Sequence, residues 1–375
     1  MVQPIPFCPP YFGDEEARAA ADVVRSGWVV GGKQQLEFER RFAALCGKSE
    51  GIAVSNWTTG AFLVLHAWGI GPGDEVIVPS LTFIASVNVI RHAGATPVFA
   101  DVDPVTLNLD PEDARRRITS KTRAIIPVDQ LGMPCRIDEF VKIGAEHGLR
   151  VLQDAACAIG SRYRGAPVGA LSELSVFSLH ARKVVSTGEG GMIVTDDAAF
   201  ATRLRRLRHQ GMSISDFQRH SLSPTTFETY PEVGFNFRLT DIQAAIGNRQ
   251  LDKLEEMLQK RKVVAARFNA ELETHPWITP PTVPEHSEVN WQTYQARVKK
   301  DAPFTRNEAM ERLHLLGIPT RRGVMSSHLE PPYAGTGVGL PHTEDATNQG
   351  LQLPLHPALS DEEIERVCAA LRGLR

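Results

Sequence analysis

Short apolar runs rich in β-branched residues alternate with stretches of helical periodicity through the first half of the chain. The apolar runs cover residues 52–55, 75–79, 97–101, 123–128 and 149–154. One helical pattern begins at Thr58 after the first run, and another follows the second run and ends at His92. Two more helical patterns cover 111–118 and 136–147. Strands separated by helices favour parallel pairing, because each crossover returns the chain to the same edge of the sheet. The alternation predicts an α/β fold with a mostly parallel central sheet flanked by helices.

Amphipathic helical patterns also precede and follow this region, at 14–26, 35–46, 197–208 and 242–258. A loop is expected at 210–230, where Ser, Thr and Pro occur without periodicity. A shift toward proline near 275–284 precedes a strand pattern at 292–298, a helix at 305–316, a glycine-rich loop at 333–339 and a closing helix from Ser360. We expect an N-terminal arm (1–13), a large domain (14–258) and a smaller C-terminal α+β domain (259–375).

Size and charge exclude several classes of function. With 375 residues and 42% hydrophobic composition, the chain can bury a large core. A net charge of -3 gives no basic surface for nucleic acid or an anionic membrane. The uncharged apolar run 76–90 is interrupted by Pro79 and by several Ser, Thr and Asn residues, so no transmembrane helix is expected. The first residues lack the basic and apolar pattern of a secretory signal, which favours a cytoplasmic protein that binds small molecules.

Cysteine and histidine give no sign of a disulfide framework or of a metal site. The five cysteines are odd in number and form no CxxC pair, and the twelve histidines are scattered along the chain. We therefore expect no bound metal.

The most informative stretch places a single lysine between two strand-like runs. Lys183 follows the run 176–179, and the turn sequence GEGG at 188–191 leads into a second run at 192–195. This pattern predicts a hairpin-like frame around the amine. A lysine held in this way can attack a carbonyl and transfer protons, although a solvated loop lysine gives the same pattern.

The sequence SLHARK at 178–183, followed by TGEGG at 187–191, resembles the cofactor-lysine signature of the DegT/DnrJ/StrS family of sugar aminotransferases, which depend on pyridoxal phosphate (PLP). The resemblance extends over nearly all of the chain from about Gly13. It implies the fold-type I transferase fold of aspartate aminotransferase. It also implies that Lys183 forms an imine with PLP and that Ser178 lies beside the cofactor.

The turn 55–60 joins a predicted strand to a predicted helix. Amide groups in the first turn of a helix can bind a phosphate, and the two threonines of this turn can equally be helix caps. The resemblance assigns Thr58 and Thr59 to the cofactor phosphate. Trp57, however, stands where the family usually has glycine, which leaves the shape of the turn open.

Two further strand ends carry candidate residues. Phe83 follows the run 75–79 and is an ordinary core residue by composition, but the resemblance implies that it stacks on the pyridine ring of the cofactor. Asp129 follows the run 123–128, where many relatives have a different motif. It either faces the substrate or is a turn carboxylate.

Asp154 ends the run 149–154, and a carboxylate at a buried strand end needs a cationic or hydrogen-bond-donating partner to stay charged. The resemblance supplies one, the protonated pyridine nitrogen of PLP, although Asp154 is also placed to cap the next segment. Three residues later the family usually has glutamine or histidine near the ring hydroxyl of the cofactor. Cys157 occurs here instead and forms only weak hydrogen bonds.

The segment GFNFRLTD at 234–241 resembles a family motif whose asparagine reaches the cofactor phosphate of the neighbouring subunit. This assigns Asn236 to the cofactor and implies a homodimer with shared active sites. The alternative for Asn236 is a turn residue, and for Arg238 a surface ion pair.

Candidates for contact with the substrate come mainly from loops. Arg321 and Arg322 are either ligands for a donor carboxylate or a nucleotide phosphate, or solvated arginines. Trp28 lies in a glycine-rich loop at 26–32 that the resemblance places near the mouth of the site, unless this loop is only a connector. Glu189 and Arg238 complete the candidates.

Taken together, these features predict a homodimeric PLP-dependent aminotransferase. Its substrate class and donor follow from the resemblance: a keto sugar attached to a nucleotide, and L-glutamate. Alternatives are an aminotransferase for a cyclitol ketone, a sugar dehydratase that uses the amino form of the cofactor, and a non-catalytic PLP-binding regulator. Lys183 argues against the dehydratase, whose lysine is replaced by histidine in that group.

Overall fold

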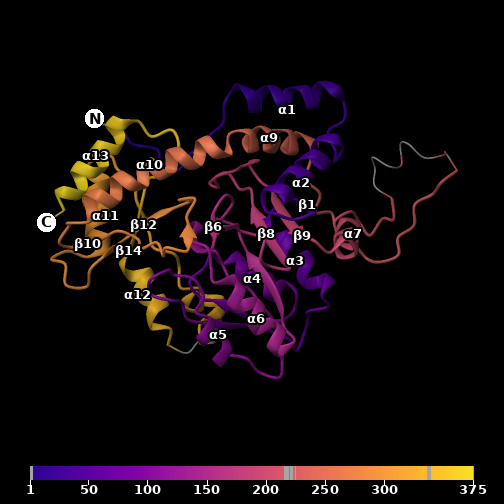
Figure 1. The fold of residues 1–375 in the computed structure, drawn as a ribbon, viewed down its shortest axis with the longest axis horizontal. Coiled ribbons are helices and arrows are strands. Elements are labelled where there is room, and N and C mark those ends of the chain that lie inside the picture. Colours follow the sequence, from indigo (N-terminus) through magenta and orange to yellow (C-terminus); the bar gives the residue numbers. More distant parts are fainter. Residues whose placement is uncertain (1–2, 215–218, 220–222, 224, 336–338, 375) are drawn as a thin grey trace.

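The computed structural model describes residues 3–214, 219, 223, 225–335 and 339–374. The loops predicted at 210–230 and 333–339 therefore lie partly outside the described residues. The centre of the molecule is a seven-stranded sheet (Figure 1). Its strands, in spatial order, are β1 (Glu50–Val54), β9 (Gly191–Thr195), β8 (Leu174–Ser178), β5 (Arg150–Asp154), β4 (Thr122–Ile125), β2 (Glu75–Pro79) and β3 (Thr96–Ala100).

Strand direction in this sheet confirms the predicted α/β fold. The neighbouring strands β8, β5, β4, β2 and β3 all pair in parallel. The edge formed by β1 and β9 is antiparallel. The predicted runs at 75–79 and 149–154 became β2 and β5, and their carboxyl ends lie at the same edge of the sheet.

Helices cover both faces of the sheet, because side chains along each strand alternate between two apolar layers. On one face, Val76 and Val78 join a cluster with α3 (Trp57–Ala67), α4 (Ala85–His92) and α7 (Ala198–Leu207). On the other face, Ile77 packs with α5 (Pro111–Arg116) and α6 (Ile137–His147), and Phe177 packs with α2 (Lys33–Leu45) and α9 (Asp241–Asp252).

The predicted hairpin around Lys183 is present. Strands β8 and β9 are antiparallel, with Ser178 opposite Gly191. The connection closes with hydrogen bonds from Leu179 N to Gly190 O at 2.9 Å and from Thr187 N to Leu179 O at 3.0 Å. The segment that carries the lysine is therefore anchored at both ends, beyond the last paired residues of the two strands.

The C-terminal part contains a second, antiparallel sheet with the order β10 (Ile278–Thr279), β12 (Tyr294–Val298), β14 (Gly350–Leu353) and β13 (Arg321–Arg322). Around it lie α10 (Leu254–Leu272), α11 (Arg306–Leu315), α12 (Pro341–Gln349) and α13 (Asp361–Arg372). Short elements complete the chain: β6 (Arg162–Tyr163), β7 (Ala166–Pro167) and β11 (Ser287–Glu288) form a third sheet, and η1 (Gln130–Gly132), η2 (Ser327–Leu329) and η3 (Pro331–Tyr333) are single 3₁₀ turns.

The N-terminal arm packs on the C-terminal part, so both ends of the chain lie at the same end of the molecule (Figure 1). Ile5 belongs to the hydrophobic cluster of the second sheet, and its N–H donates to Gly317 O at 3.0 Å. Further along, α1 (Asp14–Ser26) lies over α9, where Lys253 Nζ is 2.8 Å from a carboxylate oxygen of Glu16. The arm and α1 together thus link the two halves of the molecule.

The helical pattern predicted as one segment at 242–258 is two helices. Helix α9 ends at Asp252, α10 begins at Leu254, and the backbone turns at Lys253 (φ -96°, ψ -1°). The division that we predict between residues 258 and 259 falls inside α10, which runs from the large sheet to the second sheet (Figure 1). The domain division itself stays a prediction.

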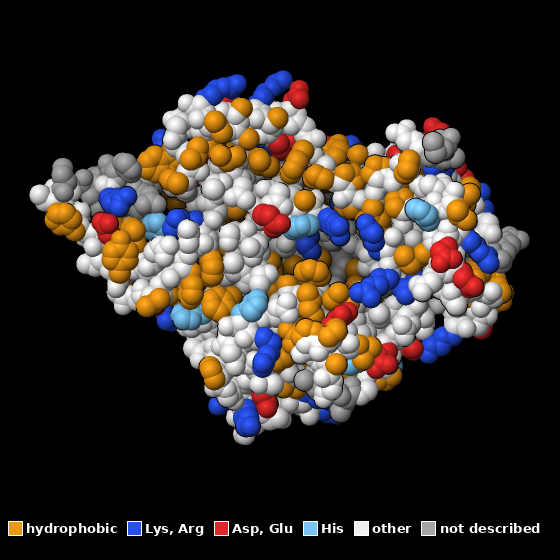
Figure 2. Space-filling model, turned by 180° about the vertical axis from the view of Figure 1, so that it is seen from behind, with side chains coloured by type: hydrophobic (Ala, Val, Ile, Leu, Met, Phe, Trp, Pro, Cys, Tyr) orange, Lys and Arg blue, Asp and Glu red, His pale blue; other side chains and the backbone are white. Residues whose placement is uncertain are grey.

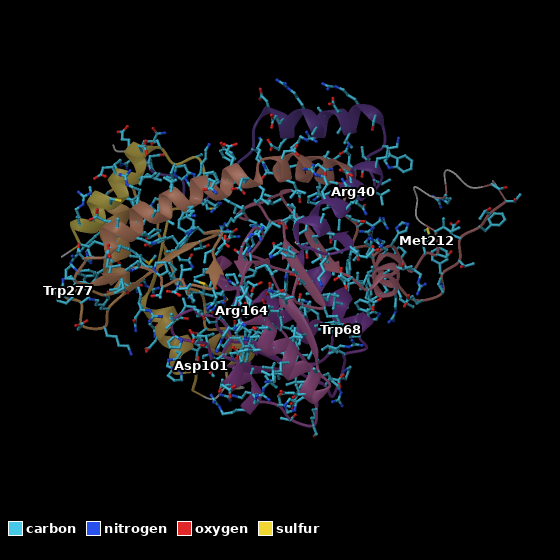
Figure 3. The ribbon with its side chains drawn as sticks, in the orientation of Figure 1. Arg40, Trp68, Asp101, Arg164, Met212 and Trp277 are labelled. Carbon is cyan, nitrogen blue, oxygen red and sulfur yellow. The ribbon has the colours of Figure 1, made fainter. Side chains whose placement is uncertain are left out.

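A buried carboxylate joins the two sheets at another point (Figure 3). Asp101, just after β3, accepts hydrogen bonds from His342 N at 3.1 Å and from Thr343 N at 2.8 Å, in the first turn of α12. A carboxylate at a helix N-terminus is favourable because it satisfies free N–H groups there. Asp101 therefore fixes α12 against the end of the central sheet.

The surface carries charges of both signs, as the face in Figure 2 shows. Among the described residues, no helix combines the length and apolar character needed to cross a bilayer. The same residues contain no group of three or more His, Cys, Asp or Glu side chains arranged to hold a metal ion. All five cysteines are free thiols.

Candidate active site

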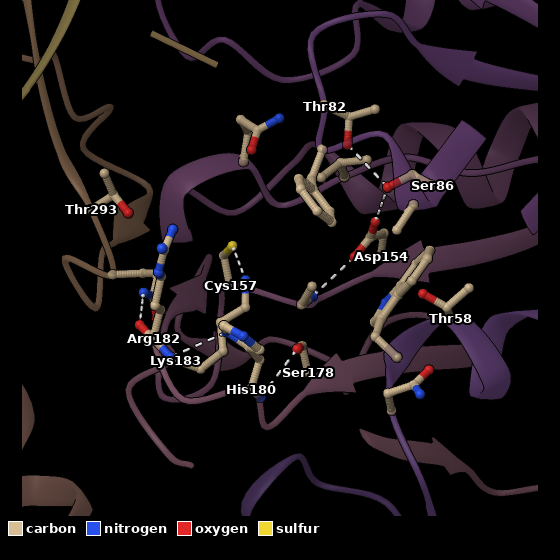
Figure 4. A pocket seen from close by; sticks show the side chains of 18 of the residues that line it. Thr58, Thr82, Ser86, Asp154, Cys157, Ser178, His180, Arg182, Lys183 and Thr293 are labelled. Atoms are coloured by element: carbon tan, nitrogen blue, oxygen red, sulfur yellow. Dashed lines mark hydrogen bonds between the residues drawn. The ribbon is translucent and has the colours of Figure 1, made fainter. Parts of the chain in front are cut away.

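A cavity of about 990 Å³ opens at the carboxyl ends of the parallel strands, where the central sheet faces the C-terminal part. The parallel-sheet rule places ligands at this edge. The cavity brings together most of the residues singled out from the sequence: Thr58, Thr59, Phe83, Asp154, Cys157, Ser178, Lys183, Glu189 and Arg321. Residues from five separate segments of the chain thus meet in one place (Figure 4).

Lys183 lies half-buried in the β8–β9 connection. Its backbone N–H donates to His180 O at 2.8 Å, which closes a turn that directs the side chain into the cavity. Its Nζ donates to Cys157 Sγ at 2.9 Å (Figure 4). Ser178, at the end of β8, lines the cavity just before this turn, and its Oγ accepts from His180 N at 3.4 Å. The amine is therefore held in a defined position by a weak acceptor.

Asp154 is 2% exposed and forms the floor of the cavity. Burial raises the pKa of its carboxyl to about 6, although hydrogen bonds from Ser86 and Ala156 and the charge of Lys183 oppose this rise. Ser86 Oγ donates at 2.7 Å and Ala156 N at 3.1 Å. Thr82 Oγ1 lies 3.0 Å from Ser86 Oγ and orients it (Figure 4). A cationic group placed beside Asp154 would restore a low pKa.

The turn before α3 forms a second wall of the cavity. Asn56 caps the helix by accepting from Thr59 N at 2.9 Å, and Thr59 Oγ1 donates to Asn56 O at 2.9 Å. Among the hydrogen bonds of the described residues, none involves the N–H of Trp57, or the N–H or hydroxyl of Thr58. This wall therefore offers three free donors at the positive end of a helix.

Trp57, which stands where the family usually has glycine, does not disturb the shape of this turn. The indole is 5% exposed, and its Nε1 donates to Val176 O at 3.1 Å. The capping box between Asn56 and Thr59 is intact. The bulky side chain is accommodated because it belongs to the apolar layer between α3 and the sheet.

Phe83 lines the cavity and is 69% exposed, so it is not the core residue that composition alone suggests. An exposed ring at the wall of a cavity is available to stack on a flat ligand.

Asp129 does not face the cavity. The side chain is fully buried and accepts from Cys135 N at 2.8 Å and from Gln153 Nε2 at 2.9 Å. Burial raises its pKa to about 7, and the nearby charge of Asp154 adds to this rise. The alternative of a substrate-facing Asp129 is therefore excluded, and its neighbour Gln130 lines the cavity instead.

Four candidates lie outside the cavity of this chain. Trp28 lines a separate groove between α1 and α9, so the loop at 26–32 does not reach the cavity. Asn236 is exposed, and Arg238 Nη1 lies 2.9 Å from His209 Nδ1. Arg322 Nη2 is 3.8 Å from Glu330 Oε1, and Arg322 does not line the cavity, whereas its neighbour Arg321 does.

Sequence reasoning missed several residues that line the cavity. Phe7 and Cys8 come from the N-terminal arm, Gln292 and Thr293 from the C-terminal part, and Arg182 from the motif itself. The arm and the C-terminal residues carry no local pattern that points to a site. Arg182 lies inside the motif that identified Lys183, but its lack of a carboxylate partner has no signal in the local sequence.

The model of the DegT/DnrJ/EryC1/StrS aminotransferase family matches residues 10–372. The chain belongs to this family. It is 41% identical to GDP-perosamine synthase of Caulobacter vibrioides over 92% of this chain and 91% of that protein. Among solved structures it resembles the aminotransferase TlmJ of Streptoalloteichus hindustanus, with a TM-score of 0.91, 32% identity and coverage of 99% and 98% of the two chains.

The putative sugar aminotransferase Spr1654 of Streptococcus pneumoniae, solved in its PMP form, matches with a TM-score of 0.93, 28% identity and coverage of 99% and 98%. Enzymes of this family use PLP, and the chain is a PLP-dependent sugar aminotransferase with the fold-type I architecture predicted from its sequence.

The cavity fits this cofactor. PLP carries an aldehyde, a basic ring nitrogen, a flat ring and a phosphate. The described residues offer an amine at Lys183, a buried carboxyl with a raised pKa at Asp154, an exposed aromatic ring at Phe83 and the free donors of the α3 N-terminus. Each chemical group of the cofactor therefore has a matching group in one cavity.

Proposed function

We propose that this sugar aminotransferase transfers the amino group of L-glutamate to a keto sugar attached to a nucleotide. The observation that carries the proposal is the convergence of Lys183 and Asp154 in one cavity of about 990 Å³. That volume is at the upper end for small-molecule sites, which leaves room for an extended substrate beside the cofactor. The similarity to a GDP-perosamine synthase supports a nucleotide-linked sugar.

In this proposal Lys183 has two roles. Its Nζ would hold the cofactor covalently, and as a free amine it would move a proton from the α carbon of the donor. PLP, when bound, supplies the aldehyde and an electron-accepting ring. Proton transfer by a positioned side chain contributes roughly 10²–10⁴-fold to such reactions. The same amine returns a proton when the keto sugar is aminated.

Asp154 keeps the ring nitrogen protonated, which makes the ring a better acceptor of electron density. Thr58 and the first-turn N–H groups of α3 bind the phosphate, and Phe83 stacks on the ring. Thr59 supports the same turn through its bonds to Asn56. Ser178 and Cys157 border the cofactor beside Lys183. Glu189 and Arg321 contact the substrate at the rim of the cavity.

We place Asn236 in the cavity of a neighbouring subunit, within a homodimer. Support comes from its exposed position outside the cavity of its own chain and from the family motif that surrounds it. The preceding segment carries the exposed apolar side chains Phe227, Tyr230 and Val233, a feature typical of protein interfaces. Trp28 and Arg238 also lie outside the cavity of their own chain, so in this proposal they contact a substrate only in the cavity of the neighbouring subunit.

Adding L-glutamate to the yellow holoenzyme tests the donor half of this proposal. We expect the cofactor absorbance to shift to that of the amino form, with one 2-oxoglutarate released per site. An unchanged spectrum contradicts glutamate as donor and favours a non-catalytic regulator or a different donor. D-Glutamate is the matched control, because it presents the same charges with the opposite configuration.

A panel of keto substrates tests the acceptor half. The amino form of the enzyme should return to the yellow form with a nucleotide-linked keto sugar and not with the free sugar. Recovery with a cyclitol ketone alone would contradict the proposed acceptor. Loss of water from the sugar without amination would indicate the dehydratase.

A further inference from the structure

The guanidinium of Arg182 lies in the cavity beside Lys183 without a partner. Arg182 is exposed and lines the cavity. Among the described residues, no hydrogen bond, ion pair or ring contact involves its side-chain nitrogens, although its backbone N–H donates to His180 Nδ1 at 3.3 Å. Several other arginines of this chain are paired with carboxylates: Arg203 and Arg206, for example, share Glu232.

The backbone at Arg182 is firmly held, so the free side chain is not the result of a loose segment. The carbonyl oxygen of Arg182 accepts from Gln292 Nε2 at 2.7 Å, and Gln292 Oε1 accepts from Val184 N at 2.9 Å. These bonds attach the lysine turn to the C-terminal part. The guanidinium therefore extends from a fixed point into the cavity.

A second guanidinium lines the same cavity. Arg321, on β13, lies over the ring of Phe7 with 5.3 Å from its Cζ to the ring centroid, and no carboxylate of the described residues pairs with it. The acidic residues that line the cavity are Asp154, buried at its floor, and Glu189, whose carboxylate lies 3.9 Å from His180 Nε2. Neither Arg182 nor Arg321 therefore has a carboxylate partner among the described residues, although Glu189 also lines the cavity.

The positions of these groups separate two ends of the cavity. Figure 4 shows Thr58, Ser86 and Asp154 at one side, Arg182 and Thr293 at the opposite side, and Lys183 with Cys157 between them. The free donors at the start of α3 serve the cofactor phosphate on the first side. The guanidinium of Arg182 is therefore available to bind a different anion. A substrate that extends past the amine of Lys183 would carry this anion.

We propose that Arg182, together with Arg321, binds an oxyanion of the substrate and so helps to set substrate specificity. This inference rests on the proposed function. A guanidinium presents a planar fork that matches two oxygens of a phosphate or carboxylate. The oxyanion has two possible sources, the diphosphate of a nucleotide-linked sugar and a carboxylate of the donor, and we expect the diphosphate.

Calorimetric titration of the holoenzyme with GDP, UDP and dTDP in one arm, and with glutarate in the other, tests this assignment. Arg182→Gln should weaken diphosphate binding roughly 10- to 100-fold, the usual effect of losing a hydrogen bond to a charged group. The diphosphate affinity of Arg182→Lys should lie between those of the unaltered enzyme and Arg182→Gln, because lysine keeps the positive charge and loses the planar fork of the guanidinium. Arg123→Gln is the control, since Arg123 pairs with Asp74 at 3.3 Å outside the cavity.

Weaker glutarate binding with unchanged diphosphate binding would support the site with the donor as the source of the oxyanion. Unchanged binding of both probes in Arg182→Gln, or no binding of either by the unaltered enzyme, would overturn the proposal. The cofactor content of each variant, measured by absorbance, separates lost oxyanion binding from a lost cofactor. The glutamate reaction of the unaltered enzyme reports separately on the proposed function.

Discussion

Thr58 and Thr59 are neighbours in the sequence, but their hydroxyl groups lie in different environments. The hydroxyl of Thr59 bonds to Asn56 O and lies 3.0 Å from Ser55 Oγ, so it stabilises the start of α3. The hydroxyl of Thr58 faces the cavity, and none of the hydrogen bonds within the described residues involves it. The sequence assigned the same role to both, because capping and phosphate binding use the same residue types.

Replacing each of these threonines with valine separates the two roles. Thr58→Val should weaken PLP binding about tenfold or more, since a hydrogen bond to a charged group contributes about 1.5–3 kcal/mol. Thr59→Val should lower the free energy of unfolding of the apoenzyme by about 1 kcal/mol through the damaged cap. Fluorescence titration with PLP and urea denaturation measure the two effects. Equal losses of cofactor affinity in both variants would contradict the separation.

Asp129 makes the stability of the fold depend on pH. Burial raises the pKa of its carboxyl in the folded protein to about 7, above the ordinary value of 3.8. The unfolded chain therefore holds fewer protons between these values, and stability falls as pH rises through this window. Asn at this position stays neutral, and the amide of Gln153 can turn over to accept from it, because Ser175 Oγ can donate or accept.

Asp129→Asn should therefore gain stability relative to the wild type on going from pH 5 to pH 8, by about 2–3 kcal/mol. Urea denaturation of the apoenzyme at the two pH values measures this change. Asp196→Asn is the control, because the bond from Lys48 lowers the pKa of that carboxyl below the window. A pH-independent difference between Asp129→Asn and the wild type would contradict a raised pKa.

At the scale of elements, local patterns predicted most helices and strands. The run 75–79 became β2 and the pattern 14–26 became α1, because apolar spacing and flanking Gly or Pro residues act locally. The break at Lys253 was missed, since neither Gly nor Pro marks it. The docking of the arm was also missed, because Ile5 packs against residues more than two hundred positions away, such as Phe268.

The arm offers a direct test of this long-range packing. Ile5 is 2% exposed within the cluster of the second sheet, so Ile5→Ala should cost about 2–4 kcal/mol of stability. Val24 on α1 is 57% exposed, and Val24→Ala should change stability by less than about 0.5 kcal/mol. Thermal and urea unfolding compare the two variants. Equal effects would mean that the arm does not contribute to the core.

At the scale of the whole molecule, the two sheets and the arm meet around one cavity. The alternation of strands and helices predicted a parallel sheet and the edge at which a ligand binds. It did not predict which distant segments close the cavity, because Phe7, Gln292 and Thr293 reach it only through tertiary packing. Arg182 was missed for a similar reason, since its lack of a carboxylate partner depends on residues far away in the sequence.

The proposed homodimer predicts complementation between two inactive variants. Lys183→Ala removes the amine and Asn236→Asp places a negative charge beside the phosphate, so each homodimer should lose activity. If Asn236 acts in the neighbouring subunit, a mixed dimer has one site with both native residues and recovers activity after the subunits exchange. Light scattering should give about twice the chain mass of 41.2 kDa. No recovery in verified mixed dimers would contradict shared sites.

The central claim is the covalent attachment of the cofactor to Lys183, and borohydride reduction of the holoenzyme tests it most directly. Reduction should fix the cofactor irreversibly, and peptide mapping should find the added mass on the peptide that contains Lys183 and on no other. Lys183→Ala, treated in the same way, should carry no label. A label on another lysine, or a labelled Lys183→Ala variant, would contradict the account.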